Sequence, residues 1–368
     1  MISIKIILVK IFKKLKKYYD KFTTISYEKI IIISKKRLKL YLYDYKQIAK
    51  PMKKFFSNEI WFYNEVYGFS YVLKKYAGYN DNYKLKLIAS HGVRYRKFTG
   101  VGFSWEFAQN APMIFTNSDF AVELIKDFVD KGVKIIPGSL QILYADKIID
   151  NKIFKNEKQK LGKNLLIFPA HTDGISHSLY DFNNFINEIE RIKLKYCFDS
   201  ITICLFWRDI ARGIDNYFLS PNFKITCAGH ISDCFFLSRL RTIIELSDVV
   251  MGNSDTSAMW YSLALGKPFY YWNDNSLKYN NTVCHTDIQF DVGWYELHKK
   301  NEEIIEIQKL FSVFSEKITD EQKKLIDKYC DIKNFKSRNE IRDIFSESEQ
   351  MYLSGNYKKY EKKVVYHK

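Results

Sequence analysis

Short apolar runs alternate with segments of helical periodicity in the middle of this chain, and polar residues collect where each apolar run ends. The four clearest runs begin near residues 164, 201, 224 and 248, and they end at Pro169, Arg208, Gly229 and Gly252. A repeated strand-then-helix order predicts parallel strands that are buried on both faces. Ligands of such sheets bind at the carboxyl ends of the strands, beside helix N-termini. The pattern therefore predicts one ligand cleft lined by four strand ends.

The rest of the chain extends this alternation. In the N-terminal half, strands are expected at 27–34, 84–90, 113–118 and 133–138, and helices at 58–76, 104–111 and 121–132, the last stopped by Gly132. In the second half, helices are expected at 182–197, 208–219, 235–247 and 254–265, then a strand at 269–272 and a helical C-terminus from about residue 301. That C-terminus has a possible capping box at Thr319 and Gln322 and a helix stop at Gly355.

We predict an α/β protein with two Rossmann-like β/α/β units and a helical C-terminus. The segment 145–163 is strongly polar and is the expected boundary between the units. This divides the chain into an N-terminal domain at 1–155, a C-terminal domain at 160–330, and a C-terminal helix with a basic tail at 331–368.

The chain has 368 residues, 46% of them hydrophobic, and its formal net charge is +16. This length favours two domains, and the positive charge favours anionic partners such as nucleotides, phospholipid headgroups or acidic glycans. Nucleic acid is disfavoured because the sequence has no zinc-finger spacing, no aromatic RNA-binding signature and no continuous basic recognition helix. The six cysteines form no C-x-x-C pair, so we interpret them as reduced and mostly buried thiols.

The first 19 residues form a basic amphipathic pattern. Ile4, Ile7, Ile11, Leu15 and Tyr18 recur at helical spacing, with six lysines between them. A secretory signal is disfavoured because a longer apolar centre and a small-residue cleavage site are absent, and no apolar run approaches the roughly 20 residues of a membrane-spanning helix. Two interpretations remain open for 1–19: a helix on an anionic membrane surface, or a helix packed on the domain with a solvated lysine face.

The segment 247–268 is the most specific candidate for ligand binding. Its apolar run stops at Gly252, where the backbone can turn tightly, and Asn253, Ser254, Thr256 and Ser257 follow at the start of a helix. Free N–H groups and the helix dipole at such a position bind anions such as phosphate, and hydroxyl groups add hydrogen-bond donors. The alternative is that Ser254 or Asp255 only caps the helix.

Several motifs together resemble a known family. FPAHTDG at 168–174, LFWRDI at 205–210, AGHISD at 228–233, FLSRLRTIIELSD at 236–248 and the G-K-P at 266–268 are similar to GT-B glycosyltransferases encoded in bacterial capsule and O-antigen loci. The resemblance covers about 160–270 and implies a nucleotide-sugar donor bound mainly by the C-terminal domain. The candidate donor-binding residues are His171, Thr172, Asp173, Arg208, Gly229, His230, Gly252, Asn253, Ser254, Thr256 and Ser257.

Each of these donor contacts has a structural alternative. His171 and His230 are residue types that also satisfy loop backbone at strand ends. Arg208 fits bidentate binding of phosphate or a sugar carboxylate, and equally a structural pairing with Asp209 or Glu245. Of Arg239 and Arg241 in the next helix, at least one is expected to be solvated.

The loop from Ser90 onward carries the candidate catalytic groups. Inverting sugar transfer needs a general base, and His91 at a strand end suits that task, with Glu106 and Asp119 as rivals. Arg94 and Arg96 are the candidate acceptor-binding residues, since they would attract an acidic acceptor or lipid phosphate. The sequence has no D-x-D motif, and WNDNS at 272–276 holds one carboxylate, Asp274, so we expect no metal and no cofactor.

The leading hypothesis is a metal-independent glycosyltransferase that acts on a surface-polysaccharide or lipid-linked glycan acceptor at the cytoplasmic face of the membrane. A transferase of polyol phosphate from a CDP-activated donor is a rival in the same class. A non-catalytic scaffold of polysaccharide assembly and a two-domain sugar-nucleotide epimerase are rivals from other classes.

Overall fold

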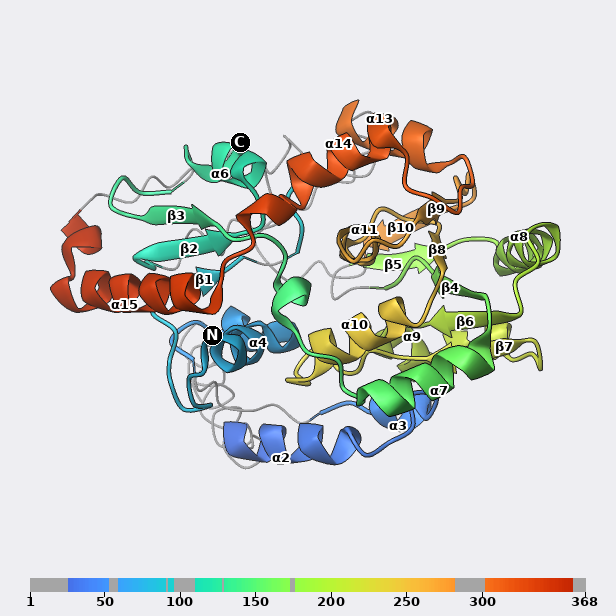
Figure 1. The fold of residues 1–368 in the computed structure, drawn as a ribbon, viewed down its shortest axis with the longest axis horizontal. Coiled ribbons are helices and arrows are strands. Elements are labelled where there is room, and N and C mark those ends of the chain that lie inside the picture. Colours follow the sequence, from blue (N-terminus) through green and yellow to red (C-terminus); the bar gives the residue numbers. More distant parts are fainter. Residues whose placement is uncertain are drawn as a thin grey trace, which may run out of the picture.

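The structure is a computed structural model that describes residues 26–52, 59–90, 92–95, 110–127, 129–172, 176–281 and 302–359. Its strands form two parallel sheets and one short antiparallel pair (Figure 1). The smaller parallel sheet has the order β1 (Ile88–Ala89), β2 (Met113–Thr116), β3 (Lys134–Pro137). The larger one has the order β7 (Phe223–Thr226), β6 (Ser200–Cys204), β4 (Asn164–Phe168), β8 (Val249–Gly252), β9 (Phe269–Tyr271). The antiparallel pair joins β5 (Ser176–Leu179) to β10 (Lys278–Asn281).

The strand order of the larger sheet defines a topological switch point. The chain enters at the central strand β4, moves outward through β6 to β7, and then returns to the other side of β4 for β8 and β9. This is the doubly wound order, in which ligands bind outside the carboxyl ends of the strands where the order reverses. The prediction of an α/β protein with Rossmann-like units is confirmed by these parallel sheets, and the switch point lies between β4 and β8.

Helices cover both faces of the larger sheet. Leu165, Ile167, Ile201 and Ile203 point to one face, where they pack with Phe185, Ile189 and Ile192 of α8 (Phe182–Lys195). Leu166 and Val250 point to the other face, where they pack with Leu237, Leu240, Ile243 and Ile244 of α10 (Phe236–Glu245). Because alternate residues of one strand are buried on opposite faces, the strands read as continuous apolar runs.

The remaining helices connect and cover the two sheets. They are α2 (Tyr27–Arg37), α3 (Tyr45–Ile48), η1 (Phe62–Gly68), α4 (Phe69–Ala77), α6 (Asp119–Ile125), η2 (Gln141–Tyr144), α7 (Asn151–Leu161), α9 (Trp207–Ala211), η3 (Ile214–Phe218), α11 (Ser257–Ala264), α13 (Glu302–Phe311), α14 (Asp320–Tyr329), η4 (Ile332–Asn334), α15 (Arg338–Ser354) and η5 (Asn356–Lys359). The last long helix lies beside the smaller sheet (Figure 1), and Arg342 Nε donates to the carbonyl of Ala77 at 2.6 Å.

Two local predictions for the C-terminal helices are confirmed. The hydroxyl of Thr319 accepts from the backbone N–H of Gln322 while the Gln322 side chain accepts in return from the N–H of Thr319, which is a complete capping box. Gly355 ends α15 in the left-handed conformation, with φ of 66°. Both features depend on residues close in sequence.

The predicted strand at 27–34 is wrong, because this segment is helix α2. Its four consecutive isoleucines favour a strand when the sequence is considered alone. In the structure Ile30, Ile31 and Ser34 are buried on one side of a helix, and the two isoleucines pack against Tyr71 and Phe235. A helical face fits this contact surface, and no described strand pairs with the segment.

The polar segment 145–163, expected as a linker, contains helix α7. Its N-terminus is capped by Asp150, whose carboxylate accepts from the N–H groups of Lys152 and Ile153, both at 2.9 Å. The expected helix 121–132 is also shorter than predicted, since α6 ends at Ile125, before Gly132. The domain boundary itself remains a prediction.

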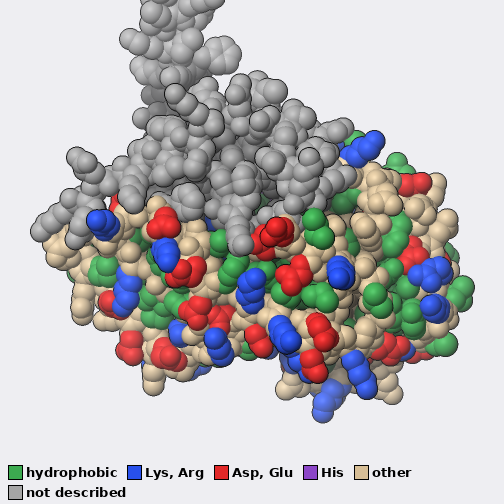
Figure 2. Space-filling model, turned by 90° about the horizontal axis from the view of Figure 1, so that it is seen from above, with side chains coloured by type: hydrophobic (Ala, Val, Ile, Leu, Met, Phe, Trp, Pro, Cys, Tyr) green, Lys and Arg blue, Asp and Glu red, His purple; other side chains and the backbone are tan. Residues whose placement is uncertain are grey.

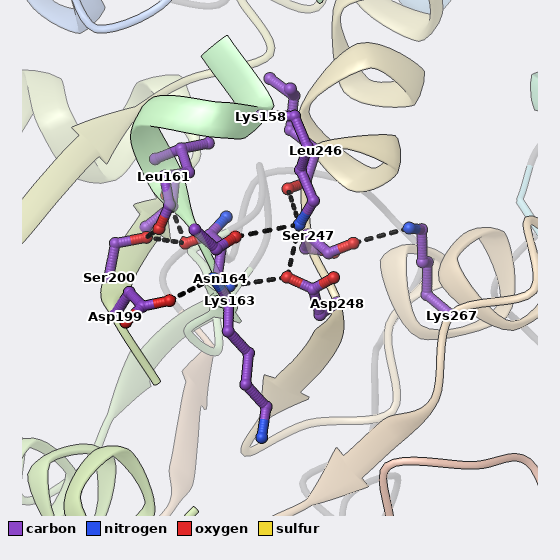
Figure 3. A network of polar contacts seen from close by, with 12 residues as sticks. Lys158, Leu161, Lys163, Asn164, Asp199, Ser200, Leu246, Ser247, Asp248 and Lys267 are labelled. Carbon is purple, nitrogen blue, oxygen red and sulfur yellow. Dashed lines mark hydrogen bonds and ion pairs between the residues drawn. The ribbon is translucent and has the colours of Figure 1, made fainter. Parts of the chain in front are cut away.

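A polar network at the amino ends of the strands fixes the edge of the larger sheet opposite the switch point (Figure 3). The Asp248 carboxylate accepts from the N–H of Asn164 at 2.7 Å and from the ammonium group of Lys158. Lys267, which belongs to the G-K-P motif, donates to the carbonyl of Ser247 at 2.6 Å, and burial lowers its pKa. The lysine of this motif therefore lies at the edge away from the candidate ligand cleft.

Within the described part of the chain, we find no helix with both the length and the apolar character needed to cross a membrane.

Candidate functional site

Asn253 joins the three strand ends at the switch point. Its Oδ1 accepts from the N–H of Ala170 after β4 at 2.7 Å, and its Nδ2 donates to Asp274 Oδ2 after β9 at 3.4 Å. Asp274 in turn accepts from the N–H of Ser276 at 2.8 Å. Because Asn253 is fully buried, these bonds fix the floor of the site.

The turn that follows β8 requires glycine at its first position. A Cβ on Gly252 would lie 2.9 Å from the carbonyl oxygen of Phe168 and 3.1 Å from the ring of Phe269. The chain then passes Ser254, whose buried hydroxyl has no hydrogen-bond partner among the described residues. A buried hydroxyl without a partner costs stability, so its presence here needs an explanation.

The N-terminus of α11 has no side-chain cap. Thr256 is the N-cap residue, with φ of −82° and ψ of 167°, and its side chain makes no capping bond. The alternative that Ser254 caps this helix is wrong, because its hydroxyl has no partner among the described residues, and the Asp255 carboxylate accepts from another residue, described next. A helix start without a side-chain cap keeps N–H donors and a positive dipole end available to an anion.

The loop after β1 of the smaller sheet reaches this helix start. The Tyr95 hydroxyl donates to Asp255 Oδ2 at 2.6 Å, and the Tyr95 hydroxyl oxygen also lies 2.8 Å from the carbonyl oxygen of Asp255. Gly92, with φ of 69°, lies so close to Ser257 that a Cβ on it would be 3.3 Å from the serine Oγ. Two loops from different sheets thus meet at the N-terminus of α11.

The carboxylate of Asp209 holds the loop after β4. It accepts from the N–H of Thr172 at 3.2 Å. Burial raises the pKa of Asp209 to about 6, although the positive charge of Arg208 acts to lower it. Arg212 Nη1 lies 3.4 Å from Thr172 Oγ1, and the ring of His171 contacts Phe206 at 4.8 Å between centroids. The main chain of Thr172 is therefore fixed by a buried acid, beside two arginines.

His230 and Trp207 form an aromatic pair at the ends of β7 and β6. Their ring centroids lie 4.2 Å apart, and the guanidinium carbon of Arg208 lies 4.9 Å from the centre of the Trp207 ring. His230 Nδ1 accepts from the N–H of Ser232 at 3.1 Å, so the proton of the neutral ring is on Nε2. Burial, and then the charges of Arg37 and Arg208, lower the pKa of His230 to about 4. This histidine is neutral near pH 7.

The low pKa of His230 predicts a loss of stability in acid. The unfolded chain takes up the histidine proton below the ordinary pKa of 6.5, whereas the folded chain does so only near pH 4. This contribution is fully present above pH 6.5, and about 3 kcal/mol of it is lost as the pH falls to 4. We expect the unfolding free energies of the wild type and of His230→Asn, which retains an acceptor for Ser232, to converge between pH 7 and pH 4 in urea titrations. A constant difference over this range would contradict the prediction.

The loop that carries His230 is built around a buried ion pair. Arg239 Nη1 donates to the Ala228 carbonyl at 2.7 Å and to Asp233 Oδ2 at 3.2 Å. Gly229 adopts φ of 115°, and a Cβ there would lie 2.8 Å from the same Arg239 nitrogen. The expectation that Arg239 or Arg241 is solvated is wrong, because Arg239 is buried and Arg241 bonds to Glu245 and to the carbonyls of Leu143 and Ala145.

The structure places the other predicted site residues as follows. His91, Arg96, Glu106 and Asp173 lie outside the described residues. Arg94 is buried, with Nε donating to Ser90 Oγ at 3.0 Å, and its acceptor-binding role remains a prediction. Asp119, the other rival base, accepts from Asn334 Nδ2 at 3.1 Å. The proposed pairing of Arg208 with Glu245 is not found, since Glu245 pairs with Arg241 and Lys147.

Sequence reasoning gave no binding role to four residues of the site: Trp207, Asp209, Arg212 and Tyr95. Trp207 precedes Arg208 at a predicted strand end, so its position was a usable signal, as was that of Asp209. Tyr95 gave no comparable signal, because its partner Asp255 is 160 residues away in the chain.

We compared the chain with known proteins. No family model matches it, and no curated protein matches it. Among solved structures, the chain is similar to sucrose-phosphate synthase from Thermosynechococcus elongatus, with TM-score 0.33 and 11% identity over 74% of this chain and 69% of that one. It is also similar to UDP-GlcNAc 2-epimerase from Neisseria meningitidis bound to UDP-GlcNAc, with TM-score 0.37 and 14% identity over 76% and 80%. A third match is UGT2 of Phytolacca americana complexed with UDP-2fluoro-glucose and pterostilbene, with TM-score 0.28 and 10% identity over 69% and 56%. TM-scores of this size do not establish a shared fold, so the fold class rests on the strand order.

Proposed function

We propose that this protein is a glycosyltransferase that moves a sugar from a nucleotide-activated donor to a surface-polysaccharide or lipid-linked glycan acceptor without a metal ion. The observation that carries the proposal is the start of α11. It has no side-chain cap, it lies beside the unpartnered buried hydroxyl of Ser254, and the loop of Gly92 and Tyr95 from the other sheet meets it. A diphosphate bound there would accept from the helix N–H groups and from Ser254.

The aromatic pair of Trp207 and His230 supports a nucleobase site. An aromatic ring gives a base a stacking surface, and a neutral imidazole with its proton on Nε2 can donate to a base carbonyl. Arg208 and Arg212 supply positive charge near the same strand ends. We assign these four side chains to the nucleotide, with the arginines and the helix dipole neutralising the leaving group.

We assign the general base to His91. Its neighbour Gly92 is packed against Ser257 at the proposed phosphate site, which puts the two functions in adjoining loops. In an inverting transfer the acceptor hydroxyl gives its proton to the base, and its oxygen bonds to the anomeric carbon. The bond from that carbon to the phosphate oxygen breaks, and the nucleotide leaves with the electron pair.

The test is Ser254→Ala, measured by thermal shift with UDP, GDP, CDP, CMP and dTDP, each with and without EDTA. We expect one nucleotide to raise the melting temperature of the wild type whether or not EDTA is present. In the variant its Kd should rise about ten-fold, because a hydrogen bond to a charged group is lost. The unfolding free energy without ligand should not fall, because the hydroxyl has no partner to lose and its burial costs stability.

Ser262→Ala is the matched control, since it removes a buried hydroxyl within α11, one that bonds to the Ala258 carbonyl at 2.7 Å. It should leave nucleotide binding unchanged. If no nucleotide shifts the wild type, the proposal fails and a scaffold is favoured. Turnover of a nucleotide sugar in the absence of any acceptor would instead indicate an epimerase.

A further inference from the structure

The helices α2, α3 and α7 lie along one edge of the molecule (Figure 1). Their exposed residues form a lysine-rich surface. We call it the basic face and define it by seven exposed lysines: Lys29, Lys35, Lys36, Lys39, Lys50, Lys152 and Lys155. None of the seven forms an ion pair with a described residue, whereas Lys46 between them pairs with Asp215. A hydrogen bond of 2.9 Å from the Tyr41 hydroxyl to Glu157 joins the α2–α3 segment to α7.

Large apolar side chains stand among these lysines. Ile32 is 53% exposed, Tyr41 50% and Ile153 47%. On α2, Ile32 lies one helical turn from Lys29, Lys35 and Lys36, and also from the exposed Glu28, so its neighbours on the outer side of the helix are three cations and one acid. Exposed apolar groups among lysines are typical of surfaces that lie in the interface of an anionic membrane.

At this edge the seven lysines outnumber the exposed acidic residues of the same segments, which are Glu28, Asp44 and Asp150. The opposite edge, over α6, α13 and α14, carries acidic and basic side chains interspersed (Figure 2). On α14, for example, Lys323, Lys324 and Lys328 alternate with three acidic residues, Asp320, Glu321 and Asp327. A general excess of lysine in the composition would give both edges the same character. The basic face therefore reflects where the fold places its lysines.

The type of cation on the basic face favours a membrane over nucleic acid as its partner. The single arginine of α2, Arg37, is buried and donates to the carbonyls of Ile48 at 3.0 Å and Lys50 at 2.6 Å. The exposed cations of the basic face are all lysines, which act as point charges and do not form the bidentate contacts that arginine makes. The chain before α2 adds the basic amphipathic pattern of residues 1–19.

We propose that the basic face docks on the surface of an anionic lipid bilayer. The lysines are attracted by the lipid headgroups, each contributing about a five-fold gain in partitioning, and Ile32, Tyr41 and Ile153 enter the boundary between headgroups and acyl chains. This surface differs from the cleft at the switch point, so the proposal is independent of sugar transfer.

The experiment is sedimentation of the full-length chain with vesicles of phosphatidylcholine and phosphatidylserine at about 70:30, compared with vesicles of phosphatidylcholine alone. The face variant is Lys29→Gln, Lys35→Gln, Lys36→Gln, Lys39→Gln. The control variant removes four exposed lysines from the C-terminal half: Lys309→Gln, Lys317→Gln, Lys324→Gln, Lys333→Gln. Both variants change the net charge equally and leave residues 1–25 intact.

We expect the wild type to bind only the anionic vesicles, the face variant to bind at least ten-fold more weakly, and the control to stay within about two-fold of the wild type. Ile32→Ser should abolish the binding that remains at high salt, because salt screens the lysines and not the apolar contact. Equal binding by the face and control variants, or no binding by the wild type, would overturn the proposal. If the face variant lost binding to a 30-base-pair duplex DNA but bound vesicles as the wild type does, the basic face would be assigned to nucleic acid instead.

Discussion

Lys74→Met is expected to lower the free energy of unfolding by about 3–5 kcal/mol. The Lys74 ammonium group, on α4, lies 2.7 Å from Glu59 Oε1, and both side chains are at most 1% exposed. The same nitrogen donates to the carbonyls of Asp81 at 2.9 Å and Tyr83 at 3.1 Å, and Glu59 Oε2 accepts from the N–H of Leu85 at 2.8 Å. Methionine would leave a buried carboxylate without a cation.

Urea unfolding of Lys74→Met measures this effect. The control is Lys126→Met, which breaks the exposed pair with Glu123 and should leave the free energy of unfolding nearly unchanged. The double variant Glu59→Gln, Lys74→Met should be more stable than the sum of the single losses implies, since it leaves no unpaired charge. A loss of less than about 1 kcal/mol for Lys74→Met would contradict this account. The pair fixes the chain leading into β1, and so the position of the loop that begins at Ser90.

Arg239→Met is expected to lose a similar 3–5 kcal/mol and also most of the nucleotide binding proposed above. Arg239 is the buried partner of Asp233 and of the Ala228 carbonyl. Its removal leaves the Asp233 carboxylate buried with the N–H of Phe235 as a donor, at 3.0 Å. The loop between β7 and α10 would then relax, and His230 would leave its place beside Trp207.

Calorimetric titration with the nucleotide found by thermal shift, performed well below the melting temperature of the variant, separates binding from unfolding. Arg191→Met is the control, because Arg191 pairs with Glu188 and is 52% exposed. It should change both stability and affinity little. If Arg239→Met bound the nucleotide as tightly as the wild type, the loop would not be part of the donor site.

The sequence by itself determined the strands of the C-terminal sheet. The runs beginning at 164, 201, 224 and 248 are largely apolar because both faces of the sheet are covered, and this leaves a strong pattern. The polar residues at their ends were recognisable because each apolar run gives way to polar residues, although Asn253, Ser254 and His230 are themselves buried. The capping box of Thr319 and Gln322 depends on residues three apart, so it too could be predicted.

The tertiary structure decided the features that depend on distant partners. The isoleucine run at 27–34 fits a strand or a helix, and contacts with Tyr71 and Phe235 select the helix. Arg239 is buried because Asp233 and a carbonyl compensate its charge, which no local pattern reveals. Tyr95 reaches Asp255 because the two sheets face each other at α11. Local patterns report burial and capping, whereas these side chains are placed by the packing of elements that are far apart in the chain.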